Sequence, residues 1–266
     1  MGSEERADLA AALARAWRSC DAIEAWPSKG RPATRVEAYQ IQDAMAEALG
    51  ETVVGWKVGA TSAKMRELDG HDDVIPGRMF ASTTWEGTDV DLPSGCFPRA
   101  RVETEFAFRL TRDAPLRGAP WMVTELADAV ELHPAIEIIG NRYPPDGPKP
   151  GSLDTIADNG GGIGFVFGPA IEHWQDLDFQ HHPISLTVDD GRPSENFLGD
   201  LRCIPLQALA DLLNHLQSRG FGMAAGDWVS TGAATVPLPI HAGARVRADF
   251  GKLGRIDLRF VEVLGS

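Results

Sequence analysis

The apolar residues of the first fifty positions recur at helical spacing. Leu9, Leu13 and Trp17 fall on one face, and the alanines around them favour helix by propensity, so we predict a helix over residues 4–20. Residues 34–50 begin with threonine followed three positions later by glutamate, the sequence of a capping box, and end in glycine, a common helix terminator. We therefore predict two helices at the start of the chain.

Strands dominate the pattern from residue 52 onward. Runs rich in β-branched or aromatic residues, or alternating between polar and apolar positions, predict strands over residues 52–59, 101–108, 135–139, 163–167, 184–188, 244–250 and 255–263. The last two are expected to pair as an antiparallel hairpin, and Asp190–Gly191 to form a hairpin turn. Further helices are expected over residues 62–68, 124–133 and 206–217, and a loop over residues 70–77. Helices early and many strands later indicate an α+β fold.

Three glutamates interrupt two of these predicted strands. Successive side chains of a strand point to opposite faces, so Glu103 and Glu105 share one face of the strand over residues 101–108. Glu137 lies in the apolar run 135–139, where a buried strand would not normally accept a charge. A bound divalent cation would offset both the mutual repulsion and the desolvation of these acids. The alternative is a solvated face of an edge strand.

Charge and composition limit the classes of partner. The chain has 266 residues and a formal net charge of -13, and we find no cluster of Lys and Arg. Nucleic acid and anionic membrane surfaces are therefore not expected as partners. The chain contains no run of eighteen apolar residues, and its N-terminus lacks a basic segment followed by an apolar one, so neither export nor membrane insertion is expected.

The cysteines are few and widely spaced. Cys20, Cys96 and Cys203 are odd in number and include no CxxC pair, which argues against a disulfide framework and against a thiolate zinc site. A reducing, cytoplasmic location fits this pattern best.

Five segments together resemble the 2-keto-4-pentenoate hydratase and 4-oxalocrotonate decarboxylase family, within the fumarylacetoacetate hydrolase superfamily. The motifs stand in the family's order at similar spacings, and they occupy residues 57–61 (KVGAT), 101–105 (RVETE), 135–137 (AIE), 154–159 (DTIADN) and 230–233 (STGA). The resemblance implies a fumarylacetoacetate-hydrolase-like mixed β-sheet roll with an N-terminal helical portion, and a homo-oligomer. The two N-terminal helices divide the chain into a helical subdomain, residues 1–50, and a metal-binding catalytic domain, residues 51–266, and because we find no long linker we expect them to form one compact unit.

The same resemblance implies a cofactor and a substrate class. In the family the corresponding carboxylates hold Mg²⁺ or Mn²⁺, which assigns Glu103, Glu105 and Glu137 as metal ligands. Hard carboxylate oxygens favour these cations over zinc and leave coordination positions for a chelating 2-oxo acid. The cation would stabilise an enolate at C2, and an enolate serves both hydration of a 2-hydroxydienoic acid and decarboxylation. The choice between a hydratase and a decarboxylase stays open.

Other positions match the family's pocket. Lys57 corresponds to the lysine of its K-x-G-x-T segment, which could bind a substrate carboxylate or donate a proton, although a strand lysine can also extend to solvent. Candidates for substrate binding come from the D-N and S-T-G segments, where turn capping and strand termination are the alternatives. They are Asp158, Asn159, Ser230, Thr231 and Gly232.

Two departures from the family concern the loop acid and the residues after the D-N pair. Ile75 stands where the family loop carries an aspartate that could move protons, and an isoleucine cannot do so. His71, Asp72 or Asp73 could take over that catalytic role, or the reaction needs no such group, as in decarboxylation. The glycine triplet 160–162 replaces a small serine or alanine and could enlarge the pocket. Both changes indicate a diverged substrate specificity.

Two other functions are alternatives to a lyase. A C–C bond hydrolase or tautomerase of the wider superfamily would want a water-activating His–Glu pair near the loop, for which His71 with Glu67 is the nearest candidate. A homologue retained only for binding would be expected to lose metal ligands, and this chain keeps Glu103, Glu105 and Glu137.

Overall fold

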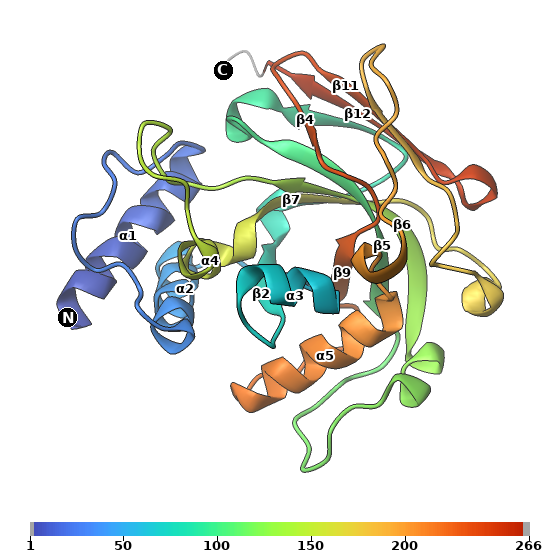
Figure 1. Ribbon diagram of the computed structural model, residues 1–266, viewed down its shortest axis with the longest axis horizontal. Helices are drawn as coiled ribbons and strands as arrows, with labels where there is room; N and C mark the ends of the chain where they lie inside the picture. The colour runs from blue at the N-terminus through green and yellow to red at the C-terminus, as the bar shows by residue number, and fades with distance from the viewer. Residues whose placement is uncertain (1–2, 263–266) are drawn as a thin grey trace.

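The computed structural model describes residues 3–262, which fold into helices packed around two β-sheets (Figure 1). Val263, the predicted end of the last strand, lies outside this range. The α-helices of the described chain are α1 (Ser3–Ser19), α2 (Arg35–Leu49), α3 (Ala63–Asp69), α4 (Ser152–Ala157) and α5 (Pro205–Ser218). The strands are β1 (Val53–Gly59), β2 (Ile75–Phe80), β3 (Thr84–Glu86), β4 (Asp89–Pro93), β5 (Arg101–Leu110), β6 (Val130–Ile139), β7 (Gly162–Phe167), β8 (Ser185–Val188), β9 (Trp228–Ala233), β10 (Leu238–Pro239), β11 (Arg245–Asp249) and β12 (Arg255–Val261).

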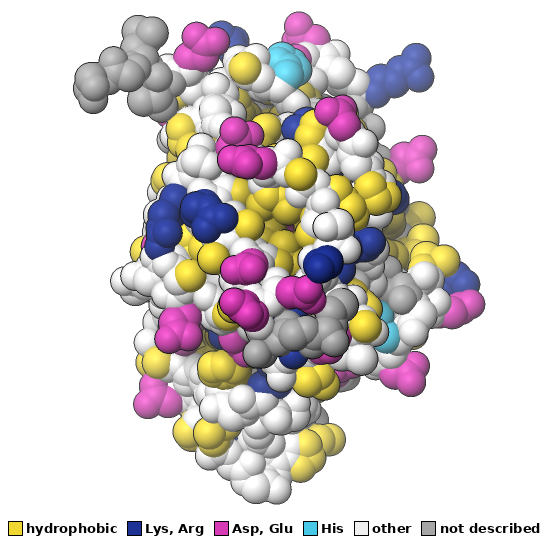
Figure 2. Space-filling view, turned by 90° about the vertical axis from the view of Figure 1, so that its left-hand side faces the viewer, with side chains coloured by type: hydrophobic (Ala, Val, Ile, Leu, Met, Phe, Trp, Pro, Cys, Tyr) yellow, Lys and Arg dark blue, Asp and Glu magenta, His cyan; other side chains and the backbone are white. Residues whose placement is uncertain are grey.

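The two N-terminal helices are confirmed, and the capping signals explain the bounds of the second. The Thr34 side chain accepts a hydrogen bond from the Glu37 amide, and Gly50 closes α2 in the left-handed conformation at φ 65°. Apolar side chains of α1 and α2 join the cluster that continues into the sheets. Figure 2 shows the side of the molecule where these helices lie, with apolar side chains among interspersed acidic and basic ones. The division into domains at residue 50 stays a prediction.

The strands of the described residues form a mixed larger sheet and a smaller one. The larger has the order β2-β1-β9-β5-β6-β7-β3, with β10 also paired to β5. The smaller has the order β4-β12-β11-β8, and the predicted antiparallel pairing of its last two strands, β11 and β12, is confirmed. Figure 1 shows β4, β11 and β12 above β5 and β6, and α5 below them. The α+β prediction is therefore confirmed.

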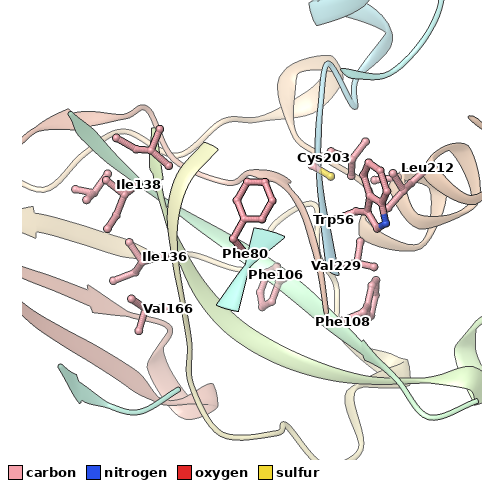
Figure 3. Close-up of a cluster of buried hydrophobic side chains, with 14 of the residues drawn as sticks. Trp56, Phe80, Phe106, Phe108, Ile136, Ile138, Val166, Cys203, Leu212 and Val229 are labelled. Atoms are coloured by element: carbon pink, nitrogen blue, oxygen red, sulfur yellow. The ribbon is translucent and has the colours of Figure 1, made fainter. Parts of the chain in front are cut away.

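Strand β5 separates the apolar core from a polar site. Phe106 packs edge-on against Phe179 and Phe250, with ring centroids 5.0 and 5.8 Å apart, and so fixes one face of β5 in the core. Figure 3 shows the buried apolar cluster that includes Phe106, Phe108, Ile136 and Val229. Because side chains alternate along a strand, the odd-numbered glutamates of β5 lie on the opposite face.

The predicted helix over residues 124–133 is wrong. The chain there makes two short 3-10 turns, Val123–Glu125 and Ala127–Ala129, and then enters β6, which is ten residues long. Val130 and Leu132 suit a strand as well as a helix, and Pro134 disfavours helical backbone at the residue before it. The helical spacing of the apolar residues, interpreted without that proline effect, predicted the wrong element.

The predicted loop over residues 70–77 extends too far, and the predicted hairpin at Asp190–Gly191 is confirmed only as a turn. Strand β2 already begins at Ile75 and includes Pro76. The proline is tolerated because β2 lies at the edge of the larger sheet. The turn is present, since the Gly191 amide donates to the Val188 carbonyl at 3.0 Å, but the strand that pairs with β8 is β11.

One disulfide contradicts the argument against disulfides. Cys20, directly after α1, is bonded to Cys96, which ends the short turn Ser94–Cys96, and their Cα atoms are 4.4 Å apart. Cys203 is a buried free thiol. The spacing of 76 residues gives no sequence signal for this pairing, because the two cysteines meet only when α1 packs beside the start of β5. Within residues 3–262, no helix combines the length and apolar character needed to cross a membrane.

Candidate metal centre

The antiparallel pairing of β5 and β6 brings the three predicted metal ligands together. Glu103 pairs directly with Glu137, and Glu105 lies two residues further along the same face, opposite Ala135. A carboxylate oxygen from each of the three glutamates lies within 4.8 Å of the others. Residues 34 positions apart in sequence thus form one acidic cluster, as the family resemblance implied.

The cluster is desolvated. Glu103 is 8% exposed, Glu105 0% and Glu137 2%. Burial, followed by repulsion from Glu137, raises the pKa of Glu103 to about 8. Burial and the charge of Glu103 raise the pKa of Glu105 to about 7, and burial raises the pKa of Glu137 well above the ordinary range although Lys57 opposes it. Three adjacent buried acids disfavour their ionised forms unless a positive charge joins them.

Two of the carboxylate oxygens fit a cation. Glu105 Oε1 and Glu137 Oε1 are buried and have no hydrogen-bond partner within the described residues. Unpartnered buried oxygens are costly, and clustered carboxylates are the hard ligands that Mg²⁺ and Mn²⁺ prefer. The donor set therefore fits a divalent cation of this kind.

The end of β9 orients Glu105. The Ser230 hydroxyl and the Gly232 amide both donate to Glu105 Oε2, the latter at 3.0 Å, which leaves Oε1 as the free oxygen. Gly232 has φ 117°, and a Cβ atom there would collide with the Thr61 hydroxyl. The glycine is therefore required both by the backbone conformation and by the contact with Thr61. Two of the predicted substrate-binding residues, Ser230 and Gly232, instead contact a candidate metal ligand.

Lys57 enters the same cluster from β1. Its strand runs parallel to β9, with Lys57 paired to Ser230, and its side chain is 7% exposed. Lys57 Nζ lies 3.8 Å from Glu137 Oε1. The ammonium is thus a buried positive charge at the edge of the acidic cluster, and the catalytic role of Lys57 stays a prediction.

The glycine triplet lies directly against Lys57 and Glu137. A Cβ atom at Gly160 would lie 2.8 Å from Lys57 Cε, and one at Gly162 would lie 2.5 Å from Glu137 Oε1. Gly160 and Gly161 have φ of 71° and 83°, a conformation that other residues rarely adopt. The space that the missing side chains release is occupied by the lysine and the glutamate themselves.

Asp158 and Asn159 hold the backbone before the triplet. Asp158 accepts from the Trp17 indole at 2.9 Å and from the Arg142 amide at 2.5 Å. The Asn159 side chain accepts from the Arg78 amide at 2.7 Å and donates to the Arg78 carbonyl at 2.8 Å. Both side chains are fully buried and bonded to the protein. Their geometry therefore favours positioning of the backbone over direct contact with a substrate.

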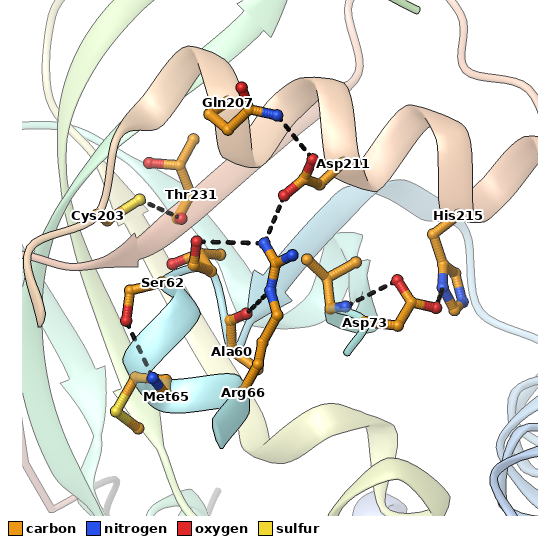
Figure 4. Close-up of polar contacts among 12 residues, drawn as sticks. Ala60, Ser62, Met65, Arg66, Asp73, Cys203, Gln207, Asp211, His215 and Thr231 are labelled. Atoms are coloured by element: carbon orange, nitrogen blue, oxygen red, sulfur yellow. Dashed lines mark hydrogen bonds and ion pairs between the residues drawn. The ribbon is translucent and has the colours of Figure 1, made fainter. Parts of the chain in front are cut away.

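Thr231 faces away from the carboxylates. Its hydroxyl donates to the Phe106 carbonyl at 2.5 Å, while its carbonyl accepts from Cys203 Sγ at 2.8 Å (Figure 4). Burial raises the pKa of the Cys203 thiol to about 12, so this cysteine stays protonated. The structure does not bring the Thr231 side chain into the cluster that Ser230 joins.

The three loop candidates lie beside α3 and α5. Asp73 Oδ2 lies 2.7 Å from His215 Nδ1 of α5, as Figure 4 shows, and Asp72 is exposed. The His71 amide donates to the Arg66 carbonyl at the end of α3. Burial raises the pKa of Asp73, but the hydrogen bond and charge of His215 outweigh it, and the net shift is downward. An acid held ionised in this way is poorly suited to donate a proton.

Ile75 lies close to Lys57. It pairs with Gly59, and a Cβ atom at Gly59 would lie 3.3 Å from Lys57 Nζ and 3.8 Å from Ile75 Cβ. Its side chain joins a small apolar cluster with Tyr39 and Ile156. The position that carries the family aspartate is thus an apolar wall near the ammonium.

Three residues at this site were not identified from the sequence. The sequence indicates Thr61 only as part of a motif and Trp17 only as a residue of an apolar helix face, and it gives no signal for Arg142. The K-x-G-x-T spacing could have indicated Thr61, since the residue follows the lysine strand. No local pattern indicates that Trp17 and Arg142 meet Asp158, because α1 reaches it only through tertiary packing.

The sequence was then compared with known proteins. No model of a known protein family matches it. The chain is 34% identical over 213 residues to a 4-oxalocrotonate decarboxylase of a Pseudomonas species, covering 78% of each chain. It is 29% identical over 227 residues to the 2-keto-4-pentenoate hydratase of Burkholderia vietnamiensis (strain G4 / LMG 22486), covering 84% of each.

The fold has a solved counterpart. The structure of 4-oxalocrotonate decarboxylase from Pseudomonas putida G7, complexed with magnesium and adipate, superimposes with a TM-score of 0.81 at 22% identity, over 97% of this chain and 98% of that one. The fold is that of the fumarylacetoacetate hydrolase superfamily, as the resemblance predicted. Within it, the chain belongs to the family of 2-keto-4-pentenoate hydratases and 4-oxalocrotonate decarboxylases, which are lyases.

Proposed function

We propose that this chain is a divalent-metal-dependent lyase acting on a 2-oxo or 2-hydroxydienoic acid. The observation that carries the proposal is the buried cluster of Glu103, Glu105 and Glu137, with two carboxylate oxygens that have no hydrogen-bond partner among the described residues. A relative in the same superfamily fold is complexed with magnesium and a dicarboxylate, adipate. Cofactor and substrate class are proposed for this chain from that combination.

The three glutamates would hold Mg²⁺ or Mn²⁺ in this scheme. When bound, the cation supplies a Lewis acid that offsets the negative charge developing on the C2 oxygen of a 2-oxo acid. Ser230 and the Gly232 amide keep Glu105 in one orientation by binding its Oε2. A fixed carboxylate needs little reorganisation when charge develops in the substrate.

Lys57 is the proposed proton donor or carboxylate-binding group. Its ammonium lies 3.8 Å from Glu137 and borders the apolar wall of Ile75. A cation on the rim of the acidic cluster can bind the anionic substrate and deliver a proton to the carbon that becomes basic in the enolate. Burial excludes water from the lysine, which limits competing proton exchange.

Of the two lyase reactions, decarboxylation fits the site better. Loss of CO₂ leaves an enolate that needs only one proton, which Lys57 can supply, whereas water addition to a diene also needs a group to activate water. The family position for such an acid is Ile75, and Asp73 is engaged with His215. Hydration of a 2-hydroxydienoic acid is the second candidate, supported by the similarity to a 2-keto-4-pentenoate hydratase.

A paired assay tests the proposal. The protein is treated with EDTA, reloaded with Mg²⁺ or Mn²⁺, and given 4-oxalocrotonate and 2-hydroxypenta-2,4-dienoate in parallel. We expect metal-dependent turnover, faster on 4-oxalocrotonate, in wild type and in the control Glu131→Gln, an exposed residue on β6, but not in Glu105→Gln. Rapid water addition to the dienoate would show that hydration is the main reaction. Wild-type protein that binds neither cation in calorimetry would refute the lyase proposal.

Assembly and location are proposed from the family resemblance and from the sequence. We infer from the family resemblance that the chain forms a homo-oligomer, which light scattering of the purified protein tests. The cytoplasmic location predicted from the sequence stays a proposal, and the Cys20–Cys96 disulfide removes the cysteine pattern as support for it. Fractionation of the producing cells would test it.

A further inference from the structure

The Cys20–Cys96 disulfide joins two segments that both lead to the proposed metal centre. Cys20 directly follows α1, and Cys96 precedes β5, the strand that carries Glu103 and Glu105. Both cysteines are half-buried, so a small thiol reagent can reach the bond. Its reduction would therefore free the end of α1 from the start of β5.

Arg142 continues the connection inward from the disulfide. Arg142 is 2% exposed. Both terminal nitrogens of its guanidinium donate to the Cys96 carbonyl at 3.4 Å, and the guanidinium carbon lies 5.2 Å from the centre of the Trp17 ring. Trp17 lies in the last turn of α1, just before Cys20. The arginine thus contacts both segments that the disulfide joins.

Asp158 accepts hydrogen bonds from both Trp17 and Arg142. The Trp17 indole donates to its Oδ1 at 2.9 Å, and the Arg142 amide donates to its Oδ2 at 2.5 Å. The carboxylate is fully buried, so each of these donors satisfies an oxygen that water cannot reach. Asp158 therefore transmits the position of α1 to the backbone that follows it.

The backbone after Asp158 is the segment 159–162, which contacts Lys57 and Glu137. Asn159, Gly160 and Gly161 all have left-handed φ angles, 54°, 71° and 83°. Three such residues in succession hold their shape only when their surroundings fix them. Gly160 and Gly162 lie so close to Lys57 and Glu137 that a Cβ atom on either would collide with them.

We propose that Trp17, Asp158 and Arg142 are positioning residues for segment 159–162, and that the Cys20–Cys96 disulfide fixes them, so that reducing this bond slows catalysis at the proposed metal centre. The proposal rests on the proposed function for its catalytic readout. An external dithiol supplies the two electrons and two protons: the S–S bond breaks, two thiols form, and the dithiol becomes a cyclic disulfide. No side chain of the metal centre is removed by this reaction.

The size of the effect follows from geometry. A small displacement of segment 159–162 changes where Lys57 and Glu137 lie relative to each other, and misplacement of catalytic groups by about 1 Å costs as much as about 100-fold in rate. We expect kcat to fall about tenfold on reduction, with a smaller change in KM, because the substrate still meets the same groups.

The test compares oxidised and dithiothreitol-treated protein in the presence of Mn²⁺. Mass spectrometry after thiol alkylation counts the thiols. Hydrogen exchange measures the amides of segment 159–162, and steady-state kinetics gives kcat and KM. We expect faster exchange in that segment and a lower kcat on reduction. Cys20→Ser/Cys96→Ser should match the reduced protein and not respond to dithiothreitol, whereas Cys203→Ser should respond like wild type.

Two further variants separate positioning from stability. Trp17→Phe keeps an aromatic ring of smaller size and removes the N–H that binds Asp158, and Asp158→Asn keeps one acceptor oxygen. We expect Trp17→Phe to lower kcat and speed exchange in segment 159–162 even in oxidised protein, and Asp158→Asn to retain more activity than Asp158→Ala. A reduced protein with a lower Tm but unchanged exchange and kcat would overturn the proposal, as would purified protein with three free thiols.

Failure of the proposed function would look different. Oxidised protein that binds Mn²⁺ but turns over neither substrate would refute the activity, while the exchange comparison would still decide whether the disulfide positions segment 159–162.

Discussion

Glu103 and Glu137 face each other as a directly paired couple on β5 and β6. Like charges directly opposite each other on neighbouring strands destabilise a sheet. Here the pair is also buried, and Glu105 lies beside it. The arrangement lowers the stability of the protein unless a proton or a cation neutralises it, which makes the stability of the fold depend on the ligand of the site.

The first prediction concerns Glu103→Gln. Removing one of the paired charges relieves the repulsion, so the metal-free variant should melt a few degrees higher than metal-free wild type. The same change removes a proposed ligand, so its affinity for Mn²⁺ should fall by at least the 10- to 100-fold typical of perturbed metal sites. Calorimetry with Mn²⁺ and thermal melts in EDTA measure both effects. Glu131→Gln, at an exposed position on β6, should change neither. Unaltered metal affinity in Glu103→Gln would contradict the assignment.

The acidic cluster shows which features of the site can be predicted from strand patterns in the sequence. Alternation along residues 101–108 placed Glu103 and Glu105 on one face from the sequence alone. The pairing of Glu103 with Glu137 could not be derived in the same way, because the register depends on the path of the 19 residues between β5 and β6 and on the apolar packing behind them. The family motifs supplied that missing link.

The second prediction concerns pH. The pKa values of Glu103 and Glu105 in the fold, about 8 and about 7, lie above the ordinary value of 4.5. Between these limits the folded metal-free protein binds more protons than the unfolded chain, so its stability falls as pH rises from about 5 to about 8. Metal and protons compete for the same oxygens, so the gain in Tm on adding Mn²⁺ should increase over that range.

Other groups also titrate over this pH range, so the measurement compares the pH dependence of stability in wild type with that in a variant. Wild type and Glu105→Gln are melted at pH 6, 7 and 8, with EDTA and with Mn²⁺. The loss of metal-free stability with rising pH should be smaller in the variant. Equal pH slopes in the two proteins would show that these carboxyls do not titrate as described.

The third prediction concerns Lys57→Met. The variant keeps much of the side-chain volume but lacks the proton and the charge, so kcat should fall by about 100-fold or more, the scale of general acid–base catalysis. Its Mn²⁺ affinity should stay equal or rise, because the ammonium no longer lies 3.8 Å from Glu137. Lys64→Met, on the exposed side of α3, is the matched control and should behave as wild type. Wild-type kcat in Lys57→Met would exclude the lysine from the chemistry.

The elements that sequence reasoning missed share a physical cause. Pro76 stands inside strand β2, and prolines usually indicate turns. A strand at the edge of a sheet tolerates the missing amide, but only the complete sheet shows that β2 is at an edge. The hydrogen bonds to Asp158 are equally non-local, since Trp17 is 141 residues away.

The last prediction concerns the glycines beside the cluster. A Cβ atom at Gly162 would lie 2.5 Å from Glu137 Oε1 and 3.2 Å from Lys57 Cγ. Gly162→Ala must therefore displace one of these groups, and we expect Mn²⁺ affinity to fall about 10-fold and kcat to fall with it. At Gly118 a Cβ atom would meet nothing within 4 Å, so Gly118→Ala is the control that should leave both quantities unchanged. Calorimetry and steady-state kinetics on the two variants test this prediction. If Gly162→Ala binds Mn²⁺ as wild type does, Glu137 does not need its present position to hold the metal. The close packing of segment 159–162 would then serve the fold alone.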